Sequence, residues 1–267
     1  MQTRKASAAA LELGYSVVYK DQHLIAINKK PGLDTRTLLS SRPFGTLLTH
    51  PLDKRVSGLL LLARSGVAAK KLSWYHAKKD RMTHTFSALL SNPLPLGQND
   101  TISTGLVKSG TKKEKMRLIE YHPAFEEMPR YPDENRVHEA ITRYRVLDTC
   151  DTGSFVSLQS FSHVKHQVRV HAEKIIQSPI IGDFRYGYKA PYYLDALFHD
   201  PQHINLYLHS SRIRLVDYYR PGVDLDISVP LPEYLVGLAR KMGMRKIEEQ
   251  WNALPTEDRT QPVATDG

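Results

Sequence analysis

The chain has 267 residues, with 37 Lys and Arg against 28 Asp and Glu, so its formal net charge is +9. It contains no run of 18 apolar residues, which predicts that no helix spans a membrane, and its single cysteine excludes an intramolecular disulfide framework and a cysteine-based zinc cluster. The excess of positive charge favours a polyanionic partner such as RNA, with a merely basic globular protein as the alternative.

The first part of the chain predicts strands before helices. Residues 1–15 are interpreted as an N-terminal extension, either a piece of an organelle transit peptide or a frayed helix. Residues 16–29 predict two short strands joined by a polar turn. The continuous apolar run in residues 57–64 predicts a buried strand, and residues 66–79 predict an exposed amphipathic helix.

The rest of the chain continues this mixed pattern. Residues 85–90 predict a strand, and residues 91–139, rich in Pro, Gly and charge, predict an irregular excursion with short strands. Alternating residues on either side of a turn at 151–153 predict a hairpin. Further on, the sequence predicts helices over 167–176 and 232–242, strands over 208–216 and 225–229, and a polar, disordered tail over 251–267. Many strands without a βαβ rhythm indicate an α+β domain with a mainly antiparallel sheet, spanning 16–250.

No single motif identifies the chemistry. Asp53, in HPLDKRVSG just before the buried strand, could cap a turn, pair with Lys54 or Arg55, or act in catalysis. The segment VKHQVRVH (164–171) favours a cationic, phosphate-binding surface over a metal site, because no third ligand follows at a metal-binding spacing. Nucleotide-binding glycine loops, a GxSxG elbow and HExxH are absent from the sequence.

Six motifs in order nevertheless resemble the RluA-type family of RNA pseudouridine synthases, across residues 16–240. They are VVYKDQHLIAINKKPGL (17–33), HPLDKRVSGLLLLAR (50–64), HTFSALL (84–90), AITRYRVL (140–147), HQVRVHAEKIIQSPIIGDFRYG (166–187), and LHSSRIRL (208–215) with VPLPEYL (229–235). The resemblance implies a pseudouridine synthase catalytic domain, with a curved mixed sheet, flanking helices and a central RNA-binding cleft.

The resemblance also implies roles for individual residues. Asp53 would be the essential acid, either attacking C1′ of the ribose or removing a sugar proton, and Arg169 would pair with it and keep it ionised. The target base would leave its stack and enter a pocket, without metal or organic cofactor. The substrate would contact His50, Phe86, His166, Gln167 and Leu208. Candidates for the RNA backbone are Lys54, Arg55 and Lys165, with Lys112, Lys113 and Lys115 of the basic run KSGTKKEKMR.

Three positions depart from the family pattern. Pro51 replaces an arginine expected to fill the space left by the flipped base, and Phe86 replaces a tyrosine over the uracil. Val164 replaces a second arginine of the cleft. Phenylalanine can still stack on a base but has no hydroxyl.

Two hypotheses therefore follow from the sequence. The first is an intracellular pseudouridine synthase, mitochondrial or cytoplasmic, that acts on ribosomal or transfer RNA as a monomeric catalytic unit. The second is a catalytically silent relative that binds RNA as a structural or ribosome-assembly factor, with assembling ribosomal particles as partners. Asp53 and Arg169 favour the first, whereas the three departures favour the second.

Overall fold

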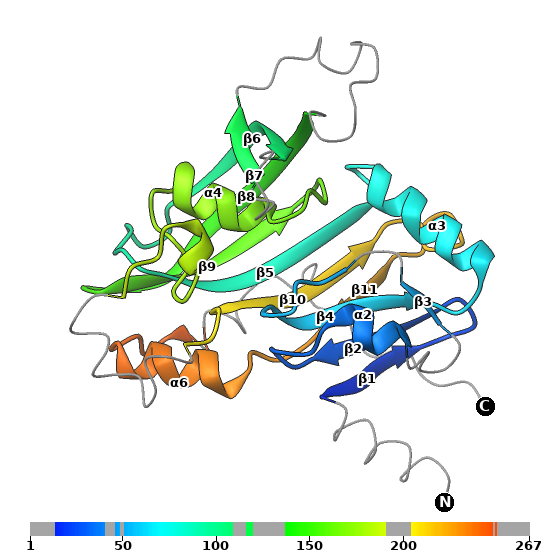
Figure 1. The fold of residues 1–267 in the computed structure, drawn as a ribbon, viewed down its shortest axis with the longest axis horizontal. Coiled ribbons are helices and arrows are strands. Elements are labelled where there is room, and N and C mark those ends of the chain that lie inside the picture. The colour runs from blue at the N-terminus through cyan, green and yellow to red at the C-terminus, as the bar shows by residue number, and fades with distance from the viewer. Residues whose placement is uncertain are drawn as a thin grey trace, which may run out of the picture.

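The protein is built on one curved mixed sheet, shown by a computed structural model that describes residues 14–40, 46–48, 51–108, 116–119, 137–190, 204–247 and 249 (Figure 1). The sheet has 11 strands in the order β1-β2-β4-β10-β5-β9-β8-β6-β7, with β11 paired to β10 and β3 to β4. Every pairing is antiparallel except the parallel contact of β4 with β10. The α+β class is thus confirmed, and no helix in the described part has the length and apolarity needed to cross a membrane.

The strands and helices have the following bounds. The strands are β1 (Tyr15–Lys20), β2 (Leu24–Lys29), β3 (Leu47–Leu48), β4 (Ser57–Ala63), β5 (Met82–Leu90), β6 (Asn99–Lys108), β7 (Met116–Ile119), β8 (His138–Cys150), β9 (Gly153–Ser160), β10 (Leu208–Leu215) and β11 (Leu225–Ser228). The helices are α2 (Thr35–Ser40), α3 (Gly66–Ala77), α4 (Gln167–Lys174), the 3-10 turn η3 (Phe184–Tyr186) and α6 (Glu233–Lys241).

Most predicted elements are found at their predicted places, including the buried strand, the helix after it and the β8–β9 hairpin. The predicted irregular excursion over 91–139 is partly wrong, because residues 99–108 form the ten-residue strand β6. β6 pairs with β8 from Asn99↔Arg145 to Leu106↔His138, so a long neighbouring strand supplies its backbone partners. Residues 116–119 form the predicted kind of short strand, β7. Residues 109–115 and 120–136 of the excursion, the N-terminal residues 1–13 and the tail over 251–267 lie outside the described residues.

The parallel contact between β4 and β10 holds the centre of the sheet together. His209 lies opposite Ser57 and Ser210 opposite Gly58. Gly58 has a φ of 105°, and a Cβ at this position would overlap the carbonyl of Ser210. Only glycine fits this close approach without strain. The chain segment that carries Asp53 enters the sheet directly before this junction.

Alternation along the central strands separates two faces of the sheet. On β5, Ala88 and Leu90 belong to a core cluster that includes Val168 and Ala172 of α4. Residues of the opposite parity, such as Leu89, pack with α6 instead. We call these the α4 face and the reverse face; α4 lies over β8 and β9 in Figure 1. The candidate site lies on the α4 face.

Candidate active site

Asp53 lies in the turn that leads into β4. Leu52 and Val56 are buried on either side of it and fix the turn, and the Val56 amide donates to the Asp53 carbonyl at 3.1 Å. The carboxylate Oδ1 accepts the Arg55 amide at 2.9 Å, and the side chain is 26% exposed. The backbone therefore holds one carboxylate oxygen in place while the side chain keeps access to solvent.

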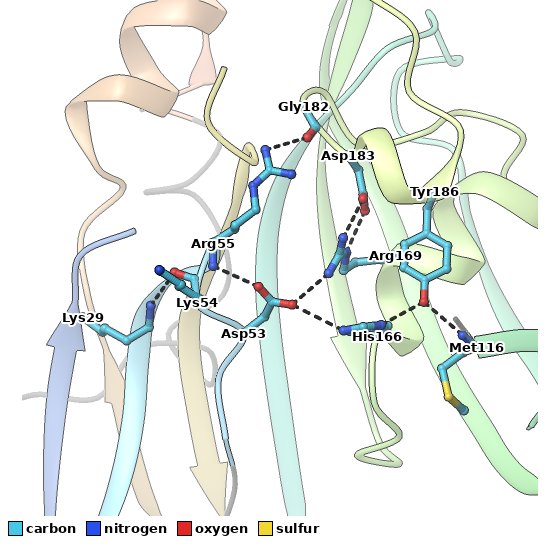
Figure 2. A network of polar contacts seen from close by, with 10 residues as sticks. All are labelled: Lys29, Asp53, Lys54, Arg55, Met116, His166, Arg169, Gly182, Asp183 and Tyr186. Carbon is cyan, nitrogen blue, oxygen red and sulfur yellow. Dashed lines mark hydrogen bonds and ion pairs between the residues drawn. The ribbon is translucent and has the colours of Figure 1, made fainter. Parts of the chain in front are cut away.

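Arg169 joins Asp53 to a second carboxylate, Asp183 (Figure 2). Its Nη1 donates to Asp53 Oδ2 at 3.0 Å, while its Nε and Nη2 donate to Asp183 at 2.7 and 2.6 Å. Arg169 is 5% exposed and Asp183 is 0% exposed in their side chains. The contact between Asp53 and Arg169, 116 positions apart, is the one that the family resemblance implies. The two hydrogen bonds to Asp183 fix the plane of the guanidinium group. They therefore also fix the direction of the bond from Nη1 to Asp53.

Asp183 is itself positioned by a tight turn before η3. Gly182 has a φ of 80°, and a Cβ there would overlap the Asn205 carbonyl oxygen. The Asp183 carbonyl accepts the amides of Tyr186 and Tyr188, which closes the turn. Glycine is thus required at the position that aims Asp183 at α4.

His166 contacts the same oxygen of Asp53 from the start of α4. Its Nε2 lies 3.3 Å from Asp53 Oδ2, and its Nδ1 lies 2.8 Å from the Tyr186 hydroxyl. The Met116 amide donates to that hydroxyl oxygen at 3.2 Å, so the hydroxyl proton is directed to Nδ1. A neutral imidazole that accepts at Nδ1 carries its proton on Nε2, where it donates to Asp53. Figure 2 shows this chain from β7 through η3 to the carboxylate.

The charges of these groups follow from burial and from their partners. Burial raises the pKa of Asp53, but the hydrogen bonds from His166 and the Arg55 amide and the charge of Arg169 outweigh it and lower the pKa. Burial and the charges of Arg169 and Lys165 together lower the pKa of His166 more than Asp53 raises it, which favours the neutral ring. For Arg169, burial lowers the pKa, but the hydrogen bonds to Asp183 and the negative charges of Asp183 and Asp53 together outweigh burial and raise it. The site therefore holds an ionised Asp53 against a charged Arg169 and a neutral His166.

The two oxygens of Asp53 are not equivalent. Oδ2 accepts from Arg169 and lies beside His166, whereas Oδ1 has only the Arg55 amide as its donor among the described residues. A carboxylate oxygen can accept two hydrogen bonds, so Oδ1 retains a lone pair for an incoming group. The geometry thus separates an anchoring oxygen from an available one.

Lys29 is a buried cation that holds the Asp53 turn through hydrogen bonds to backbone carbonyls. It is 1% exposed, and its Nζ donates to the carbonyls of Lys30, Leu33 and Lys54 at 3.1 to 3.2 Å. Burial lowers its pKa to about 8, against the opposing charge of Asp53. All three ammonium protons are therefore used to tie the Asn28–Leu33 segment to the residue next to Asp53.

The residues expected to bind the substrate fall into two groups. Phe86 on β5 is partly buried, packs against the α4-face core and stacks on His84 with ring centroids 4.1 Å apart. Gln167 is buried, and its amide bonds Ser162, Val164, Ile141 and Thr142, while Leu208 is buried in the core. Gln167 and Leu208 thus face the interior of the protein, and the expected His50 lies outside the described residues.

The cations expected to contact the RNA backbone have different surroundings in the structure. Lys54 and Lys165 are exposed next to the site residues Asp53 and His166. The Arg55 guanidinium, by contrast, donates to the carbonyls of Gly182 and Ile204 at 2.9 and 3.0 Å, which ties the Asp53 turn to the Asp183 turn. The remaining three, Lys112, Lys113 and Lys115, lie outside the described residues.

Three functional positions were not among the predicted site residues. Asp183 and Tyr186 both belong to the GDFRYG segment that carried the resemblance, and Lys29 belongs to NKKPG. An acid after glycine ordinarily indicates a turn, and a lysine ordinarily indicates the surface. In the sequence, only their position within the segments that resemble the family pointed to a role for these residues.

Comparison with known proteins gives a consistent result. Residues 14–174 match the family described as RNA pseudouridylate synthase. The mitochondrial pseudouridylate synthase RPUSD4 of Danio rerio is 26% identical over 91% of this chain and 77% of its own length. Ribosomal large subunit pseudouridine synthase C of Rickettsia typhi is 28% identical over 82% of this chain and 68% of its own. The structure of human RNA pseudouridylate synthase domain containing 4 superposes with a TM-score of 0.69 at 22% identity, covering 91% of this chain and 98% of that one.

Proposed function

The chain belongs to the RNA pseudouridylate synthase family, and we propose that it isomerises uridine in RNA with Asp53 as the reacting carboxylate. The observation that carries the assignment is the asymmetric carboxylate of Asp53, with Oδ2 held by Arg169 and Oδ1 bonded among the described residues only to the Arg55 amide. The hydrogen bonds from His166 and the Arg55 amide, with the charge of Arg169, keep the carboxylate ionised, as either a nucleophile or a proton acceptor requires.

The reaction needs one base or nucleophile at the ribose. The target nucleotide leaves its stack, because a stacked and paired uracil cannot be detached and turned within a helix. Asp53 Oδ1 then attacks C1′ or removes a sugar proton, and the C1′–N1 bond breaks with its electron pair passing to the uracil. The uracil turns and C5 bonds C1′, while the Asp53–C1′ bond breaks on the first route or Asp53 returns its proton to the sugar on the second. The C5 hydrogen leaves as a proton, and N1 takes up a proton. Asp53 is regenerated at the end of either route.

Preorganisation is the role we assign to Arg169 and Asp183. A guanidinium bound on two sides cannot turn away when the substrate enters, so Asp53 keeps its orientation without reorganisation during the reaction. Phe86 offers an apolar ring for stacking on the base. It supplies no hydroxyl, so the proton from C5 must leave by another group or by water.

The target and location are the least constrained part of the proposal. The Rickettsia relative is named for the ribosomal large subunit and the Danio rerio relative for the mitochondrion. These names support an intracellular, mitochondrial place of action on ribosomal RNA, with transfer RNA and the cytoplasm as the second choice. We further propose that the catalytic unit is monomeric, that it meets assembling ribosomal particles, and that Lys54 and Lys165 contact the RNA backbone.

Pseudouridine mapping of cellular RNA tests this function. Cells that lack the protein are complemented with the wild type or with Asp53→Asn, which keeps the side-chain shape but replaces the charged, reactive carboxylate with a neutral amide. We expect at least one pseudouridine to depend on the protein, to return with the wild type and to stay absent with the variant. An identical map in all three strains, from a wild type that binds RNA, would support the catalytically silent alternative.

A further inference from the structure

The reverse face of the sheet carries a second concave surface, away from Asp53. It is a hollow of about 480 Å³ over β5, β8, β9 and β10, which we call the reverse groove. Its lining includes Thr85, Arg143, Arg145, Gln159, Phe161 and Arg212. The volume is in the range of pockets that hold a small ligand or one to two nucleotides.

Strand register places the reverse groove opposite the active site. On β8, Thr142 bonds Gln167 of α4, so its neighbours Arg143 and Arg145 point to the other side of the sheet. Arg143 lies across from Gln159, and Gln159 from Thr85. The side chains of this row therefore share the reverse face.

The carboxylates beside the groove are already neutralised. Asp226 is bound by both Nε and Nη2 of Arg212, and Asp224 is bound by Arg214. Arg143 and Arg145 are exposed, and no carboxylate of the described residues pairs with either. The groove thus has two uncompensated guanidinium groups, whereas an ordinary solvated sheet face mixes charges of both signs.

The groove also offers contacts suited to nucleotides. The Arg143 guanidinium lies 5.5 Å from the centre of the Phe161 ring, beside which a base can stack. Arg143 and Arg145 are two residues apart on one strand, which separates them by about 6.6 Å. That separation is close to the spacing of neighbouring phosphates along a nucleic-acid strand. The polar side chains of Thr85 and Gln159 line the floor between them.

A further arginine, Arg117, lies on the edge strand β7, beyond the groove. Arg143 lies opposite Thr101 on β6, and Val107, six residues further along β6, lies opposite Arg117 on the edge strand β7. Odd-numbered residues of β6 share one face, so Arg117 projects to the same side as Arg143. Arg117 is exposed and pairs with no carboxylate of the described residues. The reverse face therefore carries a further exposed cation on β7, six residues along β6 from the groove.

We propose that the reverse groove is a second RNA-binding site, which takes single-stranded RNA flanking the nucleotide held at Asp53. Phosphates would bind Arg143 and Arg145, and a base would stack against Phe161. The inference rests on the proposed function in one respect, because it takes RNA as the substrate. It adds a means to favour long RNA over short fragments without reading sequence at the active site.

Salt dependence of RNA binding tests the proposal. The variant Arg143→Ala/Arg145→Ala is compared with Arg220→Ala/Arg245→Ala, which removes the same charge from exposed arginines outside the groove. The probe is a long, uridine-rich single-stranded RNA, with a short oligoribonucleotide that fills only the Asp53 cleft as reference. Loss of two phosphate contacts lowers the slope of log affinity against log salt by about 1.4. Between 50 and 200 mM salt the wild type would then lose about sevenfold more affinity than the groove variant.

We expect this flattening for the long RNA, an unchanged slope for the short one, and a control that behaves as the wild type. Equal slopes for the groove and control variants would overturn the groove proposal, even if the enzyme forms pseudouridine. Conversely, a flattened slope in a protein without pseudouridine activity would support the groove and contradict the proposed chemistry. Loss of a protein complex without loss of RNA affinity would assign the groove to a protein partner and overturn the proposal.

Discussion

Two buried arginine–aspartate pairs in this protein have nearly the same geometry and different surroundings. Arg169 binds Asp183 through Nε and Nη2, and Arg212 binds Asp226 through the same two atoms. In each pair the partners are 14 positions apart and their side chains are at most 7% exposed. Burial and a two-point clamp are therefore common to both pairs and do not by themselves indicate catalysis.

The difference lies in the third nitrogen of Arg169. Its Nη1 reaches Asp53, a partly exposed carboxylate that also meets His166, whereas the Arg212–Asp226 pair lies at the reverse groove. In the first pair the buried Asp183 orients Arg169, and Arg169 in turn orients the accessible carboxylate of Asp53. In the second, the buried aspartate cancels the charge of an arginine next to two exposed ones. The same unit thus serves positioning on one face and charge balance on the other.

The largest expected effect that separates the two pairs comes from removing one charge of each. Asp183→Asn leaves Arg169 buried with half its clamp, and we expect a loss of about 3–5 kcal/mol in unfolding free energy. Activity on saturating RNA should fall by roughly 100-fold or more, because Asp53 loses its fixed partner. Asp226→Asn should cost similar stability and leave the turnover of saturated enzyme near the wild type.

Chemical denaturation and single-turnover pseudouridine formation, measured below the unfolding transition of each variant, check this comparison. Equal losses of activity in Asp183→Asn and Asp226→Asn would mean that the effect is one of stability alone. It would remove the positioning role from Asp183.

A smaller effect is expected from the hydroxyl that orients His166. Tyr186→Phe leaves the Met116 amide and His166 Nδ1 without their partner, at a cost of about 1–3 kcal/mol. The imidazole proton is then no longer confined to Nε2, so we expect about a tenfold loss of activity, equivalent to about 1.4 kcal/mol in the barrier. The ring ¹⁵N shifts of His166 should show a mixture of tautomers.

Tyr75→Phe is the matched control, because the Tyr75 hydroxyl accepts the Tyr219 amide and donates to the Asp217 carbonyl in the same manner. It should lose comparable stability and keep full activity. Unchanged His166 shifts in Tyr186→Phe, or equal activity losses in both variants, would contradict an orienting role for Tyr186.

Titration of Lys29 gives the smallest expected effect. It concerns only how the unfolding free energy depends on pH. Its pKa in the folded protein is lowered to about 8 by burial, from 10.5 in the unfolded chain. Between these values the unfolded chain binds more protons than the folded one, so stability rises as pH rises. From pH 7.5 to 9.5 the wild type should gain about 2 kcal/mol relative to Lys29→Met. Parallel curves of unfolding free energy against pH would show that Lys29 titrates normally.

The strands with strong local signals were predictable from the sequence, and one strand was not. The apolar run of β4 and the alternating hairpin of β8 and β9 carry their own pattern. β6 begins with three polar residues, Asn99 to Thr101, and its conformation comes from pairing with β8 rather than from local propensity. The sequence of β6 alone does not show this pairing, so the strand was not predicted.

For the site, motif order was enough to bring Asp53 and Arg169 together, but not to define the function of their neighbours. Gln167 was expected at the substrate, yet its amide is fully used inside the protein. Asp183 resembles a turn residue in sequence, and only folding shows that it clamps Arg169. A motif thus identifies which residues gather, whereas burial and hydrogen-bond partners decide which of them can touch a substrate.

The most direct test of the central claim is tritium release from RNA labelled at C5 of uridine. When C5 bonds C1′, its hydrogen must leave for water, so release reports the isomerisation itself. The wild type should release tritium from RNA, while a folded, RNA-binding Asp53→Asn variant should release none above background. Release by Asp53→Asn at the wild-type rate would show that another group reacts with the ribose and would contradict the assignment of Asp53.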